Sequence, residues 1–179
     1  MRKAFWGYAL LGAWACSIIG GLLIYSEKQL RPFDPQLVLT DAALQKDFDQ
    51  RVSTMLIEAG AAPGSVVRLT HSQYCYCDTL VGAHQTDLLD ELGRDHYANI
   101  TLQLDSSPDL AAFIPSYPAL AILDENAKLR YLGPYAKGYG CFNGKTLINQ
   151  IVSLTQSEDY YGAVINTDAN GCFCRQHQA

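Results

Sequence analysis

Hydrophobic residues recur along the chain with two different periods, and these periods predict helices and strands in turn. Over residues 40–60, apolar side chains return every three or four positions and the run ends at a glycine, so an amphipathic helix is predicted there. Residues 62–71 begin with turn residues and continue as a β-rich run, which predicts a strand. Helical spacing returns over residues 78–96, which predicts a second helix after that strand.

The second half of the chain repeats this alternation and adds a hairpin. Alternating apolar residues predict a strand at 99–105, and a short capped helix is predicted at 106–113. Residues 117–133 predict two strands around a polar turn, and residues 145–156 have a helical apolar face. The order α-β-α-β-α-β-β-α predicts an α/β fold, with a mixed sheet that helices flank on both faces. Residues 158–179 show no strong period, so they either pack on the domain or extend freely.

The N-terminal segment is uncharged from Ala4 to Tyr25, a run of 22 residues. A helix needs about 20 apolar residues to cross the hydrocarbon core of a bilayer, so residues 4–25 predict a single-pass membrane anchor. Arg2 and Lys3 precede the run, and their positive charge favours a cytoplasmic N-terminus. We therefore expect the chain to lie in the inner membrane with its domain in the periplasm.

Two other interpretations of the N-terminal segment fit less well. A cleaved signal peptide has a shorter apolar region, whereas here the run continues for ten residues beyond the small-residue pattern at 13–15. A lipid modification at Cys16 would require small residues before it, and Trp14 occupies one of those positions. An uncleaved anchor over residues 1–25 is therefore favoured, followed by a proline-containing linker at 26–39.

Composition narrows the function of the remaining residues. The chain has 179 residues and a formal net charge of −5, and it lacks the basic patch that nucleic-acid binding uses, so no nucleic-acid partner is expected. Its length suits one domain, predicted at 40–157, with a cysteine-containing extension at 158–179. The sequence has no phosphate-binding loop, nucleophile elbow or zinc-protease motif, and no cofactor is expected.

Cysteine is the residue type that carries the candidate chemistry. Five cysteines follow the predicted anchor: Cys75, Cys77, Cys141, Cys172 and Cys174. Cysteines form lasting disulfides in an oxidising compartment, and an odd number leaves at least one that is free, shared between partners or bound to a metal. Cys75 lies where a helix is predicted to begin, and a helix N-terminus stabilises the reactive thiolate form of a cysteine.

This arrangement resembles the thioredoxin superfamily over about residues 40–156. A cysteine pair between a strand and a helix is one mark of the resemblance. Tyr117-Pro118 is the other, because members of the family have a cis-proline there, before the hairpin and facing the cysteines. The resemblance implies a thioredoxin-like fold in a membrane-anchored protein of the bacterial envelope. Thioredoxins use Cys-x-x-Cys, and this chain, with Cys-x-Cys, is similar to a branch that has a histidine in the following helix, here His84.

The resemblance also implies roles for the residues around the pair. Cys75 would be the nucleophile and Cys77 the resolving cysteine, and an oxidised domain would contain a Cys75–Cys77 bridge. A protonated His71 would stabilise the Cys75 thiolate, and Asp78 would oppose this effect. Pro118 in the cis form would hold an extended substrate segment beside the sulfurs without offering an N–H group. The expected partners are therefore protein thiols and disulfides.

Three alternatives stay open from the sequence. Thiolates suit Cu(I) or Zn, which makes a metal-binding protein or copper chaperone the main rival, although His84 lies two helical turns from Cys77, too far to share one ion. The tail cysteines would be structural, through a Cys172–Cys174 bridge or a bridge with Cys141, or they would form a relay that exchanges with the front pair. A non-catalytic adaptor that keeps only the fold is the third alternative.

Overall fold

The computed structural model describes residues 2–93, 96–136, 144–157 and 159–176. The chain divides into two compact units, Met1–Leu30 and Arg31–Ala179.

The first unit is helix α1 (Arg2–Gln29). Its segment Trp6–Tyr25 has a mean hydropathy of 1.8, and within the described ranges α1 is the one helix long and apolar enough to cross a membrane. At 1.5 Å per residue, these 20 residues rise about 30 Å, which matches the thickness of the hydrocarbon core.

The second unit is built around a five-stranded mixed sheet. In spatial order the strands are β3 (Ala98–Gln103), β2 (Ser65–Thr70), β5 (Ala119–Leu123), β6 (Leu129–Gly133) and β7 (Val164–Ile165). β2 pairs parallel with β3 and antiparallel with β5, while β7 pairs parallel with β6. β5 and β6 pair antiparallel, so the hairpin predicted at 117–133 is confirmed.

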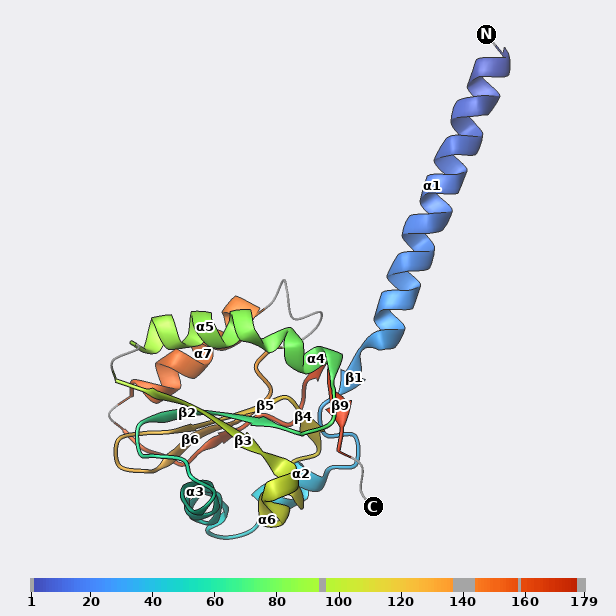
Figure 1. The fold of residues 1–179 in the computed structure, drawn as a ribbon. Coiled ribbons are helices and arrows are strands. Elements are labelled where there is room, and N and C mark those ends of the chain that lie inside the picture. Colours follow the sequence, from blue (N-terminus) through green and yellow to red (C-terminus); the bar gives the residue numbers. More distant parts are fainter. Residues whose placement is uncertain (1, 94–95, 137–143, 158, 177–179) are drawn as a thin grey trace. The chain divides into compact units, whose positions relative to one another are not determined.

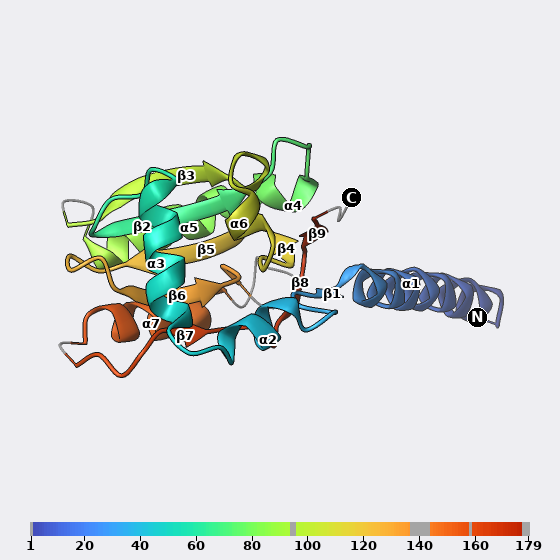
Figure 2. The same ribbon diagram turned by 90° about the horizontal axis from the view of Figure 1, so that it is seen from below.

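Helices cover both faces of this sheet (Figure 1). α5 (Val81–Leu92) and α7 (Gly144–Thr155) pack on one face, and α3 (Phe48–Glu58) and α6 (Pro108–Ala111) lie on the other (Figures 1 and 2). A 3-10 turn, η1 (Leu104–Ser106), follows β3 and leads into α6. The predicted α/β class, a mixed sheet flanked by helices, is therefore confirmed.

Successive residues of the central strands point to opposite faces, which is why both faces need helices. Val66 belongs to the apolar cluster that includes residues of α5 and α7, whereas Val67 belongs to the cluster that includes residues of α3 and α6. Leu120 and Ala121 in β5 divide between the two clusters in the same way. All four side chains are fully buried, as expected for strands whose side chains alternate across a covered sheet.

The single helix predicted at 40–60 is wrong, because the structure has two helices there. α2 (Val38–Ala43) ends before Leu44, and α3 begins after Asp47, whose backbone is left-handed with a φ of 61°. Leu44, expected on the buried face, is 82% exposed. Asp tolerates the left-handed region better than most residues, so the chain can turn at this point. The break lets α2 bury Leu39 independently of the apolar face of α3.

The helix predicted at 78–96 also differs from the structure. It begins earlier, as the short α4 (Tyr76–Thr79), which is followed by α5 after Leu80. α5 ends at Leu92, and Gly93 takes a positive φ of 83° at its end. Glycine adopts positive φ without steric cost, which explains why the helix ends here rather than at residue 96.

The C-terminal segment packs on the domain through short strands, which decides between the two expectations for it. After β7 at the sheet edge, β8 (Asn170–Gly171) pairs antiparallel with β1 (Arg31–Pro32). β9 (Cys174–Arg175) pairs antiparallel with β4 (Ser116–Tyr117), which directly precedes Pro118. Residues far apart in the sequence therefore meet at the end of the sheet where α4 begins (Figure 2).

Candidate functional site

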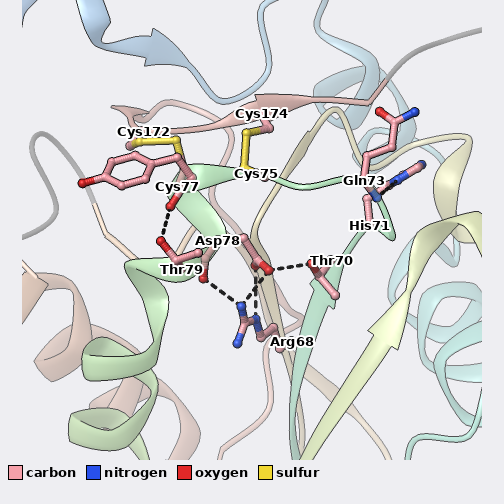
Figure 3. Close-up of a disulfide and its surroundings, with 11 residues drawn as sticks. Arg68, Thr70, His71, Gln73, Cys75, Cys77, Asp78, Thr79, Cys172 and Cys174 are labelled. Atoms are coloured by element: carbon pink, nitrogen blue, oxygen red, sulfur yellow. Dashed lines mark hydrogen bonds and ion pairs between the residues drawn. A yellow bond between two sulfur atoms is a disulfide. The ribbon is translucent and has the colours of Figure 1, made fainter.

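Two disulfides join the front cysteine pair to the tail cysteine pair. Cys75 is bonded to Cys174, with their Cα atoms 6.2 Å apart, and Cys77 is bonded to Cys172, with their Cα atoms 5.4 Å apart. The two pairs run in opposite directions, so each residue of one pair faces one residue of the other (Figure 3). The site therefore consists of four cysteines rather than the two that the sequence motif suggested.

The Cys75–Cys77 bridge expected from the resemblance is absent, and so is the Cys172–Cys174 bridge that was one alternative for the tail. The sequence left the full pairing open, and β9 brings the tail cysteines beside the front pair. The bridge considered between Cys141 and the tail concerns a residue outside the described ones, and both tail cysteines are bonded elsewhere.

The four sulfurs differ in their access to solvent. Cys75 is the residue that precedes α4, as predicted for the nucleophile, but only 4% of its surface is exposed. Cys77, Cys172 and Cys174 are half-buried. An external thiol therefore reaches the Cys77–Cys172 bridge more readily than Cys75, which the tail covers in this state.

Three of the sulfurs also lie close to one another across the two bridges. The Sγ atoms of Cys75, Cys77 and Cys174 all lie within 4.8 Å of each other. A thiolate formed at Cys77 would therefore have both sulfurs of the second bridge within that distance. Exchange between the bridges needs little movement of the backbone in this arrangement.

Contacts that do not involve sulfur hold the tail against the domain. The rings of Phe173 and Phe33 pack edge to face with centroids 5.1 Å apart, and both residues are buried. The backbone N–H of Phe33 donates to the carbonyl of Ala169 at 2.7 Å. With its nitrogen turned towards these acceptors, the orientation that satisfies the amide, the Gln176 side chain donates to the carbonyls of Ile114 at 2.7 Å and Ala111 at 3.1 Å. The tail position is thus determined by packing and hydrogen bonding as well as by the disulfides.

Tyr117 and Pro118 lie next to the tail. The Tyr117–Pro118 peptide bond is cis, as the resemblance implied. Tyr117 is opposite Cys174 in the β4–β9 register, so an extended segment does lie beside this proline, and that segment is the tail of the chain itself. Tyr117 is buried, and burial, followed by the negative charge of Asp78, raises the pKa of its hydroxyl.

His71 lies against Tyr117, the residue that precedes the cis-proline. Its ring stacks on Tyr117 with centroids 5.4 Å apart and an interplanar angle of 22°. Its Nδ1 accepts a hydrogen bond at 3.1 Å from the backbone N–H of Gln73. The effect expected of His71 on the Cys75 thiolate stays a prediction.

Asp78 is paired, and its partners were not identified from the sequence. The Arg68 guanidinium contacts the Asp78 carboxylate at 2.7 Å and donates to the Asp78 carbonyl at 2.8 Å. The Thr70 hydroxyl donates to the same carboxylate at 2.9 Å (Figure 3). Arg68 offsets the charge that was expected to oppose a thiolate, and the pair fixes α4 to β2. The sequence feature that could have indicated this pair is Arg68 itself, a charged residue between the apolar residues Val67 and Leu69 of β2.

His84 lies on α5 and is half-buried. The group of sulfurs that could hold a metal ion contains Cys75, Cys77 and Cys174, and His84 is not part of it. The sequence argument that His84 and the front pair are too far apart to share an ion agrees with this grouping. The structure thus brings together Cys75, Cys77, Cys172, Cys174, Tyr117 and His71.

Comparison with known proteins identifies the family. The model of a family described as "Domain of unknown function (DUF6436)" matches residues 41–176. The chain belongs to this family. The match includes all four bridged cysteines, together with Tyr117 and Pro118. No curated protein matches the chain, and no solved structure matches it.

Proposed function

We propose that this protein is a membrane-tethered thiol–disulfide exchange protein with a thioredoxin-like domain, and that its reactive unit is the four-cysteine cluster. The observation that supports the proposal best is the distance between the bridges, because Cys75, Cys77 and Cys174 have sulfurs within 4.8 Å of one another. Exchange proceeds by attack of a thiolate on a disulfide sulfur, so neighbouring bridges can pass a disulfide between them. Partners are protein thiols or disulfides.

The exchange begins at the more accessible bridge. A thiolate from outside attacks the sulfur of Cys172, forms a mixed disulfide with it, and releases Cys77 as a thiolate. Cys77 then attacks the sulfur of Cys75, which forms a Cys75–Cys77 bridge and releases Cys174 as a thiolate. Cys174 attacks Cys172 and expels the external thiolate. Two disulfides are present before and after, so no net oxidation occurs.

This rearrangement gives the bridge predicted from the sequence a place in the cycle. The Cys75–Cys77 disulfide forms when Cys174 is expelled as a thiolate, which removes the covalent tie between the front pair and the tail. A partner dithiol reduces this bridge by two electrons and becomes oxidised itself. The crossed state in the structure is therefore the closed state of the exchange protein, in which the tail occupies the place of a substrate.

The proposed location is the inner membrane, with the N-terminus cytoplasmic and the domain periplasmic. The apolar helix α1 and the positive charge at Arg2 and Lys3 support this orientation. The two disulfides support it independently, because such bridges persist in oxidising compartments and are rare in the cytosol.

The rearrangement can be tested by peptide mapping. The full chain, purified oxidised in detergent micelles, is incubated with a small monothiol, alkylated at intervals and digested for mass spectrometry. We expect the two crossed bridges to decline as Cys75–Cys77 and Cys172–Cys174 bridges form. The double variant Cys77→Ser/Cys172→Ser keeps the Cys75–Cys174 bridge without a neighbouring thiol and should show no rearrangement, whereas Cys16→Ser, which changes a cysteine in α1, should behave as the wild type.

A second measurement tests exchange with a partner. The rearranged protein is mixed with a reduced dithiol peptide, and oxidation of the peptide is followed together with loss of the Cys75–Cys77 bridge. Stoichiometric oxidation of the peptide is expected. Crossed bridges that stay intact until a strong reductant removes both together, with no peptide oxidation, would show that the four cysteines are only structural.

A further inference from the structure

We propose that the reduced four-cysteine cluster is a zinc site, with Cys75, Cys77, Cys172 and Cys174 as its thiolate ligands. This goes beyond disulfide exchange, because it assigns a ligand to the state in which both bridges are open. Three of the sulfurs already lie within 4.8 Å of one another, and the fourth, on Cys172, is bonded to Cys77. The two motifs therefore supply four soft donor atoms, of which three are already grouped and the fourth, on Cys172, is one bond from the group.

The sulfur spacing suits a tetrahedral ion. Zinc binds thiolate sulfur at about 2.3 Å, so the sulfurs of a tetrahedral site are separated by roughly 3.8 Å. That separation is longer than a disulfide bond, about 2.0 Å. It is shorter than 4.8 Å, the distance within which the sulfurs of Cys75, Cys77 and Cys174 all lie from one another. Sulfurs within a bridge must separate and sulfurs of different bridges can stay near their present distances, which side-chain rotation can accomplish.

The tail stays in place without its disulfides, which a zinc site requires. Phe173 is buried against Phe33, and β8 pairs with β1. The Gln176 amide, in its satisfied orientation, donates to the carbonyls of Ala111 and Ile114. None of these contacts involves sulfur, so reduction leaves Cys172 and Cys174 beside the front pair. The carboxylate next to Cys77, that of Asp78, is already paired with Arg68 and does not compete as a ligand.

The chemistry balances with a dithiol as the reductant. Each bridge takes two electrons from one dithiol, so two dithiols are oxidised and four cysteine thiols form. One Zn²⁺ then displaces four protons and binds the four thiolates, and its oxidation state does not change. The disulfide state and the zinc state therefore exclude each other, and an oxidant that restores the bridges releases the ion.

Four protein thiolates determine the kind of site. Sites with four protein ligands are closed and structural, whereas catalytic zinc sites keep one position for water or substrate. Thiolate donors in a tetrahedral arrangement favour zinc among common divalent ions. We therefore expect the reduced protein to hold zinc as a structural ion that fixes the tail, in place of the two disulfides.

Metal binding by the full chain in detergent micelles tests the proposal. The protein is reduced with a dithiol, freed of the reductant, and titrated with Zn²⁺, or with Co²⁺ as a spectroscopic substitute whose thiolate charge-transfer absorption reports sulfur ligation. We expect one ion per reduced chain, no binding by the oxidised chain, and release of the ion on oxidation. Failure of the reduced chain to bind, or equal binding by the oxidised chain, would overturn the assignment.

Variants identify the ligands. Cys174→Ser should weaken zinc binding at least tenfold, and Cys174→His, which restores a ligand, should recover most of it. Cys16→Ser, which changes the free cysteine in α1, should bind as the wild type, and loss of binding in this variant would refute the four-ligand set. Peptide mapping on the same preparations separates the proposals. Rearrangement without zinc binding removes only the zinc site, and zinc binding without rearrangement removes only the exchange function.

Discussion

The two disulfides should contribute to stability in a strongly non-additive way, because they cross-link nearly the same two points of the chain. The bridged residues are 99 positions apart in one case and 95 in the other. In the chain-entropy model, a bridge that closes a loop of about 100 residues stabilises a fold by about 4.7 kcal/mol. Once one bridge exists, the second closes a ring of roughly six residues, for which the same relation gives about 2 kcal/mol.

Three variants measure this difference. One replaces Cys75 and Cys174 by alanine, one replaces Cys77 and Cys172, and the third replaces all four. Alanine avoids placing a hydroxyl at the buried position 75. Each pair variant keeps one large loop closed, so we expect a loss of about 2 kcal/mol in the free energy of unfolding. The quadruple variant should lose about 7 kcal/mol, more than the two pair losses together.

Urea unfolding of the full chain in detergent micelles, without reductant, provides the assay. Both tryptophans, Trp6 and Trp14, lie in α1, so far-UV circular dichroism is a better signal for the domain than tryptophan fluorescence. Cys16→Ser serves as the control and should leave the free energy unchanged. A quadruple loss no larger than the sum of the two pair losses would refute the reasoning, since it would mean that the bridges constrain the unfolded chain independently.

Three further changes test the contacts around the site. Phe173→Ala should lower the free energy of unfolding by about 3 kcal/mol, because it empties a buried aromatic position, and should speed reduction of the bridges, measured by alkylation. Asp78→Asn should lower it by about 2 kcal/mol in urea unfolding, because Arg68 loses its charged partner. Asp49→Asn should lower the pKa of Tyr160 from about 12 toward 10.0, and ultraviolet titration measures this change. Burial is the largest cause of the raised pKa, and the negative charge of Asp49, which the variant removes, is the next. Since the folded pKa of Tyr160 is above the unfolded one, its stabilisation is complete below about pH 10 and disappears as the pH rises through about 12.

Matched controls make these results interpretable. Tyr161→Ala changes an aromatic ring that is 93% exposed and should alter stability by less than about 0.5 kcal/mol. Asp109→Asn changes an exposed carboxylate and should be similarly neutral. Tyr160→Phe should remove the transition near pH 12 from the tyrosine titration. A loss for Tyr161→Ala as large as that for Phe173→Ala, or an unchanged titration in Asp49→Asn, would contradict the contacts described here.

Much of the fold could be predicted from local pattern. The run of Val66, Val67 and Leu69 predicted a strand, because β-branched and other apolar residues after turn residues are typical of one. The hairpin around residues 124–126 and the helix at 145–156 followed from turn residues and helical spacing. These elements depend on the residues within them, so their type is readable without knowledge of the rest of the chain.

Other features depend on contacts between distant segments and were not predicted. The break between α2 and α3 follows from what each helix buries, and Leu44 carried the same apolar signal as its buried neighbours. Arg68 pairs with a residue ten positions away, and nothing in the strand pattern named Asp78 as its partner. Such interactions depend on how elements pack, which local periodicity does not encode.

The sequence by itself determined which residues are candidates for the chemistry, since it places cysteines at a strand-to-helix junction and in the tail. Only the tertiary structure decided how they pair. Cys75 and Cys174 are bonded because β9 lies beside β4 and because Phe173 packs on Phe33. Both contacts join the C-terminal segment to residues far from it in the sequence. Spacing within a motif says which sulfurs are near in sequence, whereas disulfide pairing depends on which sulfurs are near in space.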